Sequence, residues 1–378
     1  MTPSSDAVHD ALATVADPEI RRPITELGMV DTVDIADDGS VAVRVLLTVS
    51  GCPMRSEITD RVTRAVAAVP GVSGVSVELG VMTDEQRTAM RESLRGPARD
   101  IVFNRPGSLT RIFAVASGKG GVGKSSITVN LAAALARRGL AVGLLDADIY
   151  GHSVPRMLGL DRAPTVVDGM LLPPEANGVR AISILPFKPG GSAEPVAFRG
   201  PMLHRALEQF LTDVWWGDLD VLLLDLPPGT GDVAISSVQL LPSSELIVVT
   251  TPQQAAAEVA VRAGMLAQQT KQRVAGVIEN MGGFGCPHCG EPIDLFGVGG
   301  GDTVAATLTA ALGTDIPLLG RVPFDPRLRE GGDDGRPLVL SDPDSAAGTA
   351  ITSIATGLAE RKRGLAGLDL GVTPAGRP

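Results

Sequence analysis

"SGKGGVGKSS", residues 117–126, is the stretch that decides the fold. It follows directly after an apolar run, RIFAVA at 111–116, and apolar residues at helical spacing come next, with Ile127, Leu131 and Leu135 on one face. In a strand–turn–helix of this kind the glycines let successive backbone N–H groups turn inward around phosphate oxygens. The sequence therefore predicts a phosphate-binding loop and an α/β nucleotide-binding domain around it.

The loop matches the spacing G-x-x-x-x-G-K-[ST] through Gly118, Gly123, Lys124 and Ser125. The positive end of the helix dipole faces the phosphates, Lys124 is expected to reach the β- and γ-phosphates, and Ser125 is expected to ligate Mg²⁺. Lys119 adds a second cation inside the loop. It points either to the γ-phosphate region, to the nucleotide of a neighbouring molecule, or simply to solvent.

Outward from the loop, further apolar runs alternate with helical stretches. They lie at 141–146, 181–187, 221–225, 246–250, 274–280 and 317–323. Continuous apolar runs between helices indicate strands that are buried on both faces, so we predict a doubly wound, mostly parallel sheet over residues 109–360. The Gly- and Pro-rich segment 361–378 is expected to be a flexible tail.

The first 82 residues predict a separate small α+β domain. Residues 41–49 read as a strand, residues 56–69 have helical spacing, and a second strand follows that helix. Residues 83–108 are mostly polar and contain Gly-Pro and Arg-Pro-Gly, which favours a linker with a short helix.

Acidic residues end two of the predicted strands, where open α/β sheets bind ligands. Asp225 is predicted to hold the Mg²⁺ shell, and Asp148 is predicted to orient the attacking water. For Asp146 a role in the Mg²⁺ shell and a role as a turn cap are both open.

Two more residues are candidates for nucleotide contact. Gly229 lies in a Pro-Pro-Gly-Thr-Gly turn after Asp225, and its N–H is expected to donate to the γ-phosphate and to report its loss. Asn280 ends another strand, and its amide offers the donor and the acceptor that the edge of adenine needs. A turn cap is the alternative for Asn280.

Cysteine usage indicates a metal or cluster site, because three cysteines in 378 residues form no disulfide framework. Cys286 and Cys289 lie in the loop GFGCPHCGEP, residues 283–292. Zinc and iron–sulfur clusters both take four such thiolates, so a two-fold dimer would have to supply the missing pair. A reduced dithiol, a redox pair and ligation by His288 are the weaker alternatives. Cys52, before a predicted helix, is either a reactive thiol or a buried inert one.

The formal net charge of −10 argues against non-specific binding to DNA or to anionic membranes. The first residues have no basic segment followed by an apolar one, and no apolar run reaches transmembrane length. We therefore expect a cytoplasmic protein that binds neither nucleic acid nor membrane.

Several stretches together resemble one family. GKGGVGKSS, DADIYG, DLPPGTGD, TTPQ, ENMGGFGCPHCG and FGVGGG occur in the order found in the Mrp-type iron–sulfur cluster carrier ATPases, which are MinD/ParA-like P-loop proteins with a deviant Walker A loop. This resemblance covers about residues 109–345. Residues 1–82 resemble the small metal–sulfur cluster assembly factor domain, through DPEIRRPITELGMVDTVDI and GCPM.

The resemblance implies a homodimer that hydrolyses ATP, holds a [4Fe–4S] cluster between its subunits and passes it to apo iron–sulfur proteins. It implies that Lys119 crosses the dimer, that Lys124 and Asp148 act in hydrolysis, and that Cys286 and Cys289 ligate the cluster. The implied ATP contacts are Gly118, Lys119, Gly120, Gly121, Val122, Gly123, Lys124, Ser125, Ser126, Gly229 and Asn280. His152 departs from the family, which has Pro at this position; it is either a surface change or an adjustment of the switch.

Two other classes of protein remain as rivals. A MinD/ParA-like positioning ATPase with a structural zinc site of four cysteines between subunits would use the same loop and the same thiolates. It would need a membrane helix or a basic DNA surface, and neither is visible in the tail or in the charge. A soluble kinase or ATP-driven reductase would need a second-substrate signature, which the sequence lacks. The resemblance favours the cluster over zinc.

Overall fold

The computed structural model describes residues 2–49, 54–95, 100–148, 151, 153–183, 200–270, 272–286 and 288–360. The chain forms two compact units. The amino-terminal unit comprises Met1–Asp100 together with Pro164–Pro173 and Asp213–Gly217. The nucleotide unit comprises Ile101–Ala163, Pro174–Thr212 and Asp218–Pro378. The boundaries predicted at residues 82 and 109 stay predictions.

A three-stranded sheet forms the centre of the amino-terminal unit. Its order is β1 (Val30–Ile35), β2 (Ser40–Leu47), β3 (Gly74–Val81), with β1 antiparallel and β3 parallel to β2. Every second residue of β2 from Val41 to Val45 is buried, which gives the sheet one apolar face. Helices α1 (Ser5–Ala13) and α2 (Arg55–Ala67) supply the buried residues packed with it.

The rest of this unit comes from less obvious stretches of sequence. Helix α3 (Asp84–Arg95) occupies part of the predicted linker, with acidic residues in its first turn that suit the helix dipole. The hairpin of β6 (Thr165–Val167) and β7 (Met170–Leu172) places three buried side chains, Val167, Met170 and Leu172, in the core of the unit. An ion pair of 2.8 Å joins Arg91 to Asp168 in the hairpin turn.

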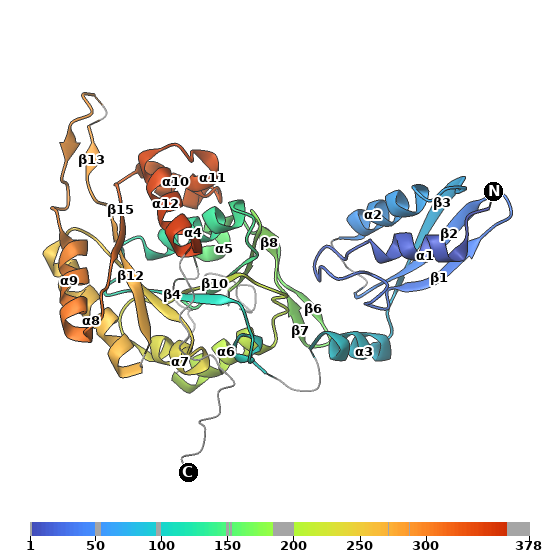
Figure 1. The fold of residues 1–378 in the computed structure, drawn as a ribbon, viewed down its shortest axis with the longest axis horizontal. Helices are drawn as coiled ribbons and strands as arrows, with labels where there is room; N and C mark the ends of the chain where they lie inside the picture. The colour runs from blue at the N-terminus through green and yellow to red at the C-terminus, as the bar shows by residue number, and fades with distance from the viewer. Residues whose placement is uncertain are drawn as a thin grey trace, which may run out of the picture. The chain divides into compact units, whose positions relative to one another are not determined.

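An eight-stranded sheet runs through the described part of the nucleotide unit (Figure 1). The strands in spatial order are β15 (Leu318–Val322), β12 (Arg273–Asn280), β11 (Glu245–Thr250), β4 (Arg111–Ser117), β10 (Val221–Asp225), β5 (Val142–Asp146), β9 (Val179–Ile182) and β8 (Glu175–Ala176). All neighbours pair in parallel except the short edge strand β8, which is antiparallel to β9. The predicted doubly wound, mostly parallel sheet is confirmed.

Helices cover both faces of this sheet. In chain order they are α4 (Lys124–Arg137), α5 (Val154–Leu158), α6 (Gly200–Thr212), α7 (Asp232–Leu240), α8 (Gln254–Thr270), α9 (Gly300–Leu312), α10 (Pro326–Asp333), α11 (Leu338–Ser341) and α12 (Ala346–Glu360), after a 3-10 turn at Val102–Asn104. Figure 1 shows α4 and α12 on one side and α8 and α9 on the other. Phe113 and Val115 pack with α4 and α12, and Ile112 and Ala114, which point the other way, are equally buried. A fully buried side chain of the size of Val or Phe contributes about 2 kcal/mol to stability.

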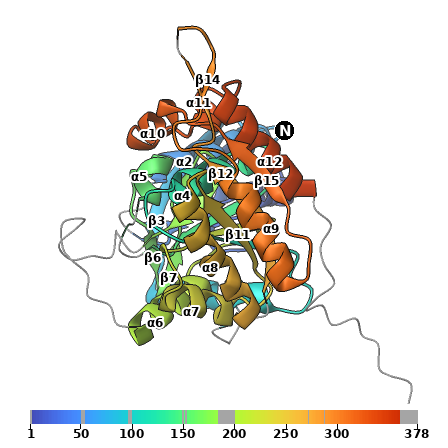
Figure 2. The ribbon, with the colours of Figure 1, turned by 90° about the vertical axis from the view of Figure 1, so that its left-hand side faces the viewer.

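A small hairpin extends from the end of the sheet. It pairs β13 (Phe284–Gly285) with β14 (Pro292–Ile293), and Figures 1 and 2 both show it projecting from the helical body of the unit. Among the described residues, no helix is both long and apolar enough to cross a bilayer. The predictions made for Cys52, His152 and the tail at 361–378 concern residues that lie outside the described ones, and they stay predictions.

Candidate functional site

The strand order brings the predicted nucleotide residues to one edge of the sheet. Strand β4, which precedes the phosphate loop, lies between β10 and β11, and Asp225 at the end of β10 pairs in register with Asp146 at the end of β5. Because parallel strands all end at the same edge, the loop and both acids converge there.

A cavity of about 200 Å³ opens above the loop. Its walls are Ser117, Lys119, Gly120, Gly121, Val122, Gly123, Lys124, Ser125, Ser126, Asp148, Ser153, Met157 and Pro228. Most of these residues were predicted as phosphate contacts. Ser153 and Met157 were not, because they lie outside the loop pattern and carry no spacing signal of their own.

Two glycines of the loop are required by close approaches. A Cβ on Gly123 would lie 2.3 Å from the side-chain nitrogen of Asn280, and Gly123 has a φ of +80°. A Cβ on Gly118 would lie 2.3 Å from the backbone of Val259 in α8. Both positions therefore exclude any larger residue, since contacts this short force the backbone to move.

Lys124 and Asp225 form the buried centre of the site. The Lys124 Nζ donates to Asp225 Oδ1 at 2.7 Å, and the side chains are 6% and 0% exposed. The Ser125 hydroxyl donates to Asp225 Oδ2 at 2.5 Å, and the Thr128 hydroxyl donates to Oδ1 at 2.9 Å. Sequence reasoning missed Thr128, although its place one helical turn after Lys124 was a usable signal.

Asp146 completes this cluster, and its surroundings disfavour the charged form of its carboxyl. Burial raises the pKa of its carboxyl well above the usual range, and the negative charge of Asp225 raises it further. The Oδ1 atom accepts from the Asp148 N–H at 3.2 Å, whereas the buried Oδ2 has no hydrogen-bond partner among the described residues.

These oxygen atoms fit a hard divalent cation. Mg²⁺ binds through one or two carboxylates, a hydroxyl and waters, and Asp225, Ser125 and the unpartnered Oδ2 of Asp146 offer that set. A cation there would also offset the repulsion between the two carboxylates.

The other predicted contacts are held in defined positions. Lys119 Nζ donates to Gln253 Oε1 at 3.2 Å, and Asp148 Oδ1 accepts from the Gly151 N–H at 3.0 Å. The Gly229 N–H donates to the Ser117 carbonyl at 2.8 Å, so donation to a phosphate requires this turn to move.

Asn280 lies where its amide contacts the loop itself. Its Nδ2 donates to the Val122 carbonyl at 2.9 Å, and the residue is 4% exposed. The predicted contact with adenine stays a prediction.

The two cysteines occupy the projecting hairpin. The Cys286 N–H donates to the Glu291 carbonyl and the Gly290 N–H donates to the Cys286 carbonyl, which closes the turn around the pair. Hydrogen bonds from the backbone N–H groups of Cys289 and His288 lower the pKa of the Cys286 thiol, which favours the thiolate that metals bind. Cys289 is exposed.

One chain offers only part of a ligand set at this hairpin. Among the described residues, no three His, Cys, Asp or Glu side chains gather to hold a metal. Apolar side chains lie exposed on and just after the hairpin: Ile293, Leu295 and Val298 are 42%, 53% and 73% exposed. Exposed apolar residues beside an incomplete site are typical of a surface that meets another molecule.

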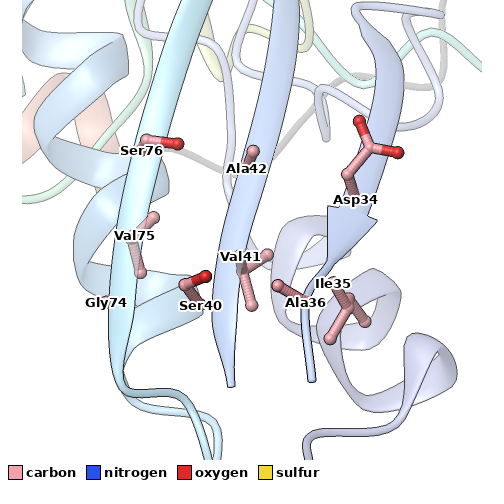
Figure 3. Close-up of a pocket in the computed structure, with 9 residues that line it drawn as sticks. All are labelled: Asp34, Ile35, Ala36, Ser40, Val41, Ala42, Gly74, Val75 and Ser76. Atoms are coloured by element: carbon pink, nitrogen blue, oxygen red, sulfur yellow. The ribbon is translucent and has the colours of Figure 1, made fainter. Parts of the chain in front are cut away.

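A second cavity, of about 390 Å³, lies in the amino-terminal unit at one end of its sheet (Figure 3). Asp34 of β1, Ser40 of β2 and Ser76 of β3 are its polar lining. No residue that the sequence analysis selected lies in it.

Comparisons with known proteins cover both units. Residues 108–359 match the family model described as NUBPL iron-transfer P-loop NTPase, and residues 5–79 match the model described as iron-sulfur cluster assembly protein. A Mycobacterium bovis protein named iron-sulfur cluster carrier protein is 62% identical over 373 residues, which are 98% of this chain and 97% of that protein. A Deinococcus radiodurans protein of the same name is 43% identical over 357 residues, covering 94% and 95%.

Among solved structures, the nucleotide-binding protein from Archaeoglobus fulgidus in complex with ADP is similar, with 34% sequence identity and a TM-score of 0.52. The match covers 70% of this chain and 95% of the archaeal one.

Proposed function

The chain belongs to the iron-transfer P-loop NTPase family, and from that premise we propose that it is an ATP-hydrolysing carrier of [4Fe–4S] clusters that works as a homodimer. The cluster is its cargo, which Cys286 and Cys289 of two subunits hold together and release to apo iron–sulfur proteins. The observation that carries the proposal is a pair of free cysteines on a projecting hairpin, Cys286 half-buried and Cys289 exposed, in the same unit as a phosphate loop.

The nucleotide half of the proposal rests on the buried cluster at the strand ends. Lys124 and the loop N–H groups would bind the phosphates, and Asp225, Ser125 and Asp146 would hold Mg²⁺, which neutralises charge on the phosphates when it is bound. Asp148, which lines the cavity, would orient the attacking water. Binding of ATP would draw Lys124 from Asp225 toward the phosphates.

The dimer half rests on the hairpin and on Lys119. Two-fold symmetry presents the same hairpin twice and so supplies four thiolates. The exposed Ile293, Leu295 and Val298 give that interface apolar surface. The Lys119 Nζ donates to Gln253 Oε1 and to no phosphate-loop side chain that is described, and across a dimer this lysine would reach the partner's nucleotide. We also propose that the carrier works in the cytoplasm, where its recipients would be other metalloproteins.

Metal analysis of the full chain purified without oxygen tests the proposal. The expected result is about four irons per dimer after anaerobic reconstitution, with the absorbance of a [4Fe–4S] cluster and transfer to an apo acceptor. A protein that stays free of metal, or that binds zinc and takes up no iron, would overturn the proposal. A tightly held zinc per dimer, resistant to replacement by iron, would instead support a positioning ATPase with a structural Cys₄ site.

A further inference from the structure

Asn280 stands between the two functional elements of the nucleotide unit. It is the last residue of β12, and its side chain donates to the Val122 carbonyl inside the phosphate loop at 2.9 Å. The contact is close on both sides, because Gly123 leaves room for the amide only by having no Cβ. A movement of the loop would therefore displace the side chain of Asn280.

The chain that follows Asn280 leads straight into the cysteine hairpin. Met281 has a φ of +62°, a conformation that non-glycine residues adopt rarely and that collects at switch segments. The Gly282 N–H then donates to the Val322 carbonyl, and the Gly283 carbonyl accepts from the Phe324 N–H. These two hydrogen bonds hold the connection against Val322, the last residue of β15, and against Phe324 just after it.

Aromatic packing fixes the base of the hairpin. The ring of Phe324 lies 5.8 Å from that of Phe284 in an edge-to-face arrangement and 6.0 Å from that of Phe296. Phe284 pairs with Ile293 in the hairpin, and Cys286 follows two residues later. The residue before Asn280 is also held: the buried Glu279 carboxylate accepts from the Gly301 N–H at 2.6 Å.

We infer that Asn280 is a positioning residue that transmits nucleotide occupancy from the phosphate loop to the cysteine hairpin, through Met281 and the contacts of Phe324. Phosphate in the loop holds Val122 in place, Val122 holds Asn280, and the strand end then sets the order of the hairpin. This inference rests on the proposed function, because that function gives the hairpin its ligands to hold.

Asn130 provides a matched control. It is also 4% exposed, and its Nδ2 donates to the carbonyl of Ser126, which is likewise a residue of the cavity wall. Its Oδ1, however, accepts from the N–H of Val339 at the start of α11, not from the hairpin connection. Asn130→Ala therefore disturbs the loop helix to a similar degree and leaves the proposed path intact.

The test is hydrogen–deuterium exchange of the metal-free full chain, with and without Mg²⁺ and a non-hydrolysable ATP analogue. In the wild type we expect nucleotide to slow exchange at residues 284–293 about five-fold or more, alongside protection of residues 117–126. The nucleotide concentration is raised for each variant until residues 117–126 are protected as in the wild type, so that any weaker binding is compensated. Under that condition Asn280→Ala should lose the hairpin response, and Asn130→Ala should keep it. A hairpin response in Asn280→Ala equal to that of the wild type would overturn the inference, as would its absence in the wild type.

Phe324→Ala tests the same path from the other end, where no cavity residue is touched. It should bind nucleotide as the wild type does and lose the hairpin response; a retained response would overturn the inference. Iron content of the same proteins separates the two proposals. Iron on the wild type with an unchanged response in Asn280→Ala sinks only the inference, whereas a lost response with no iron on any protein sinks only the carrier function.

Discussion

The phosphate loop and the cysteine hairpin belong to one unit but differ in how far the fold surrounds them. The loop is packed against α8 at Gly118 and against Asn280 at Gly123, and its lysine is buried beside Asp225. The hairpin projects from the body, exposes Cys289, and has a short pair of strands as its frame. The described contacts of the loop are therefore made within one chain, whereas the hairpin offers two of the four thiolates that the proposed cluster would take.

The difference teaches where each function can fail. A site with its ligands inside the fold depends on buried neighbours, so its variants change both chemistry and stability. A site on an exposed hairpin depends on few contacts, so its variants change ligation and leave the fold intact.

The largest expected effect is on hydrolysis. Lys124→Ala removes the cation that would face the β- and γ-phosphates, and we expect kcat for ATP hydrolysis to fall about 10²- to 10³-fold, measured as phosphate release. Iron binding should be unchanged, because no described contact joins Lys124 to the hairpin. Arg138→Ala, at the far end of α4, is the control and should hydrolyse ATP normally. Equal loss of iron in Lys124→Ala would mean that the two sites are not separable.

The second-largest effect is expected on iron binding by the cysteine pair. Cys286→Ser should reduce iron from about four per dimer to less than about one, because serine is a poor ligand for a cluster and symmetry doubles the loss. Its thermal unfolding should match that of the wild type, since the thiol makes no core contact. His288→Ala is the companion variant and should keep its iron. Loss of iron in His288→Ala, or its retention in Cys286→Ser, would show that the ligands are assigned wrongly.

Asp146→Asn should stabilise the metal-free protein at neutral pH. The folded pKa of Asp146 is raised above its ordinary value of 3.8, so its contribution to stability is present below that value and is lost as the pH rises toward the folded pKa. The asparagine cannot ionise, and we expect the free energy of unfolding to rise by about 1–2 kcal/mol near pH 7. The gain should shrink to nothing near about pH 4.

Urea unfolding with a chelator present, across that range of pH, measures the effect. Asp148→Asn serves as the comparison and should show a smaller gain, because the charge of Asp148 contributes less than burial and Asp225 to the raised pKa of Asp146. A gain in Asp146→Asn that is the same at all pH values would contradict the electrostatic explanation. The same variant should bind Mg²⁺–ATP more weakly, because the carboxylate pair would be incomplete.

The smallest effect concerns the apolar surface after the hairpin. Val298 is 73% exposed, so Val298→Ser should change the free energy of unfolding by less than about 0.5 kcal/mol. Dimer affinity, measured by analytical ultracentrifugation, should fall about three- to ten-fold if this face is covered in the dimer. An unchanged dimer would place the interface elsewhere.

The sequence predicted the sheet well because its strands are buried on both faces. Runs such as 221–225 and 246–250 are apolar up to their last residue, and they became β10 and β11 with almost the same bounds. Of the strands that it missed, β6, β7, β8, β13 and β14 have two or three residues each, too few for a period to show. The sequence also missed β1, which has six residues but no buried one to give it an apolar face. Helix α3 lies where the sequence analysis expected a short helix within the linker, and it has 12 residues.

The candidate site was predictable where spacing carries the chemistry. Lys124, Ser125, Asp225 and Asp148 were selected from the loop pattern and from strand ends, and the structure gathers them at one edge. The contact of Asn280 was not predictable, because an amide can serve adenine or a carbonyl equally well and only tertiary structure decides which it meets. Thr128 differs, because its place one helical turn after Lys124 was a signal that the sequence analysis did not use.

The hairpin of β6 and β7 has a consequence for how this chain can be divided. Val167, Met170 and Leu172 belong to the core of the amino-terminal unit, although they lie in sequence between segments of the nucleotide unit. A fragment cut after Asp100 would leave that core without three of its apolar side chains, and the remaining piece would carry them bare into water. The two units are therefore poorly suited to exchange between proteins. Recombination at the boundary after Asp100 would produce two fragments with uncovered apolar side chains, both prone to aggregate.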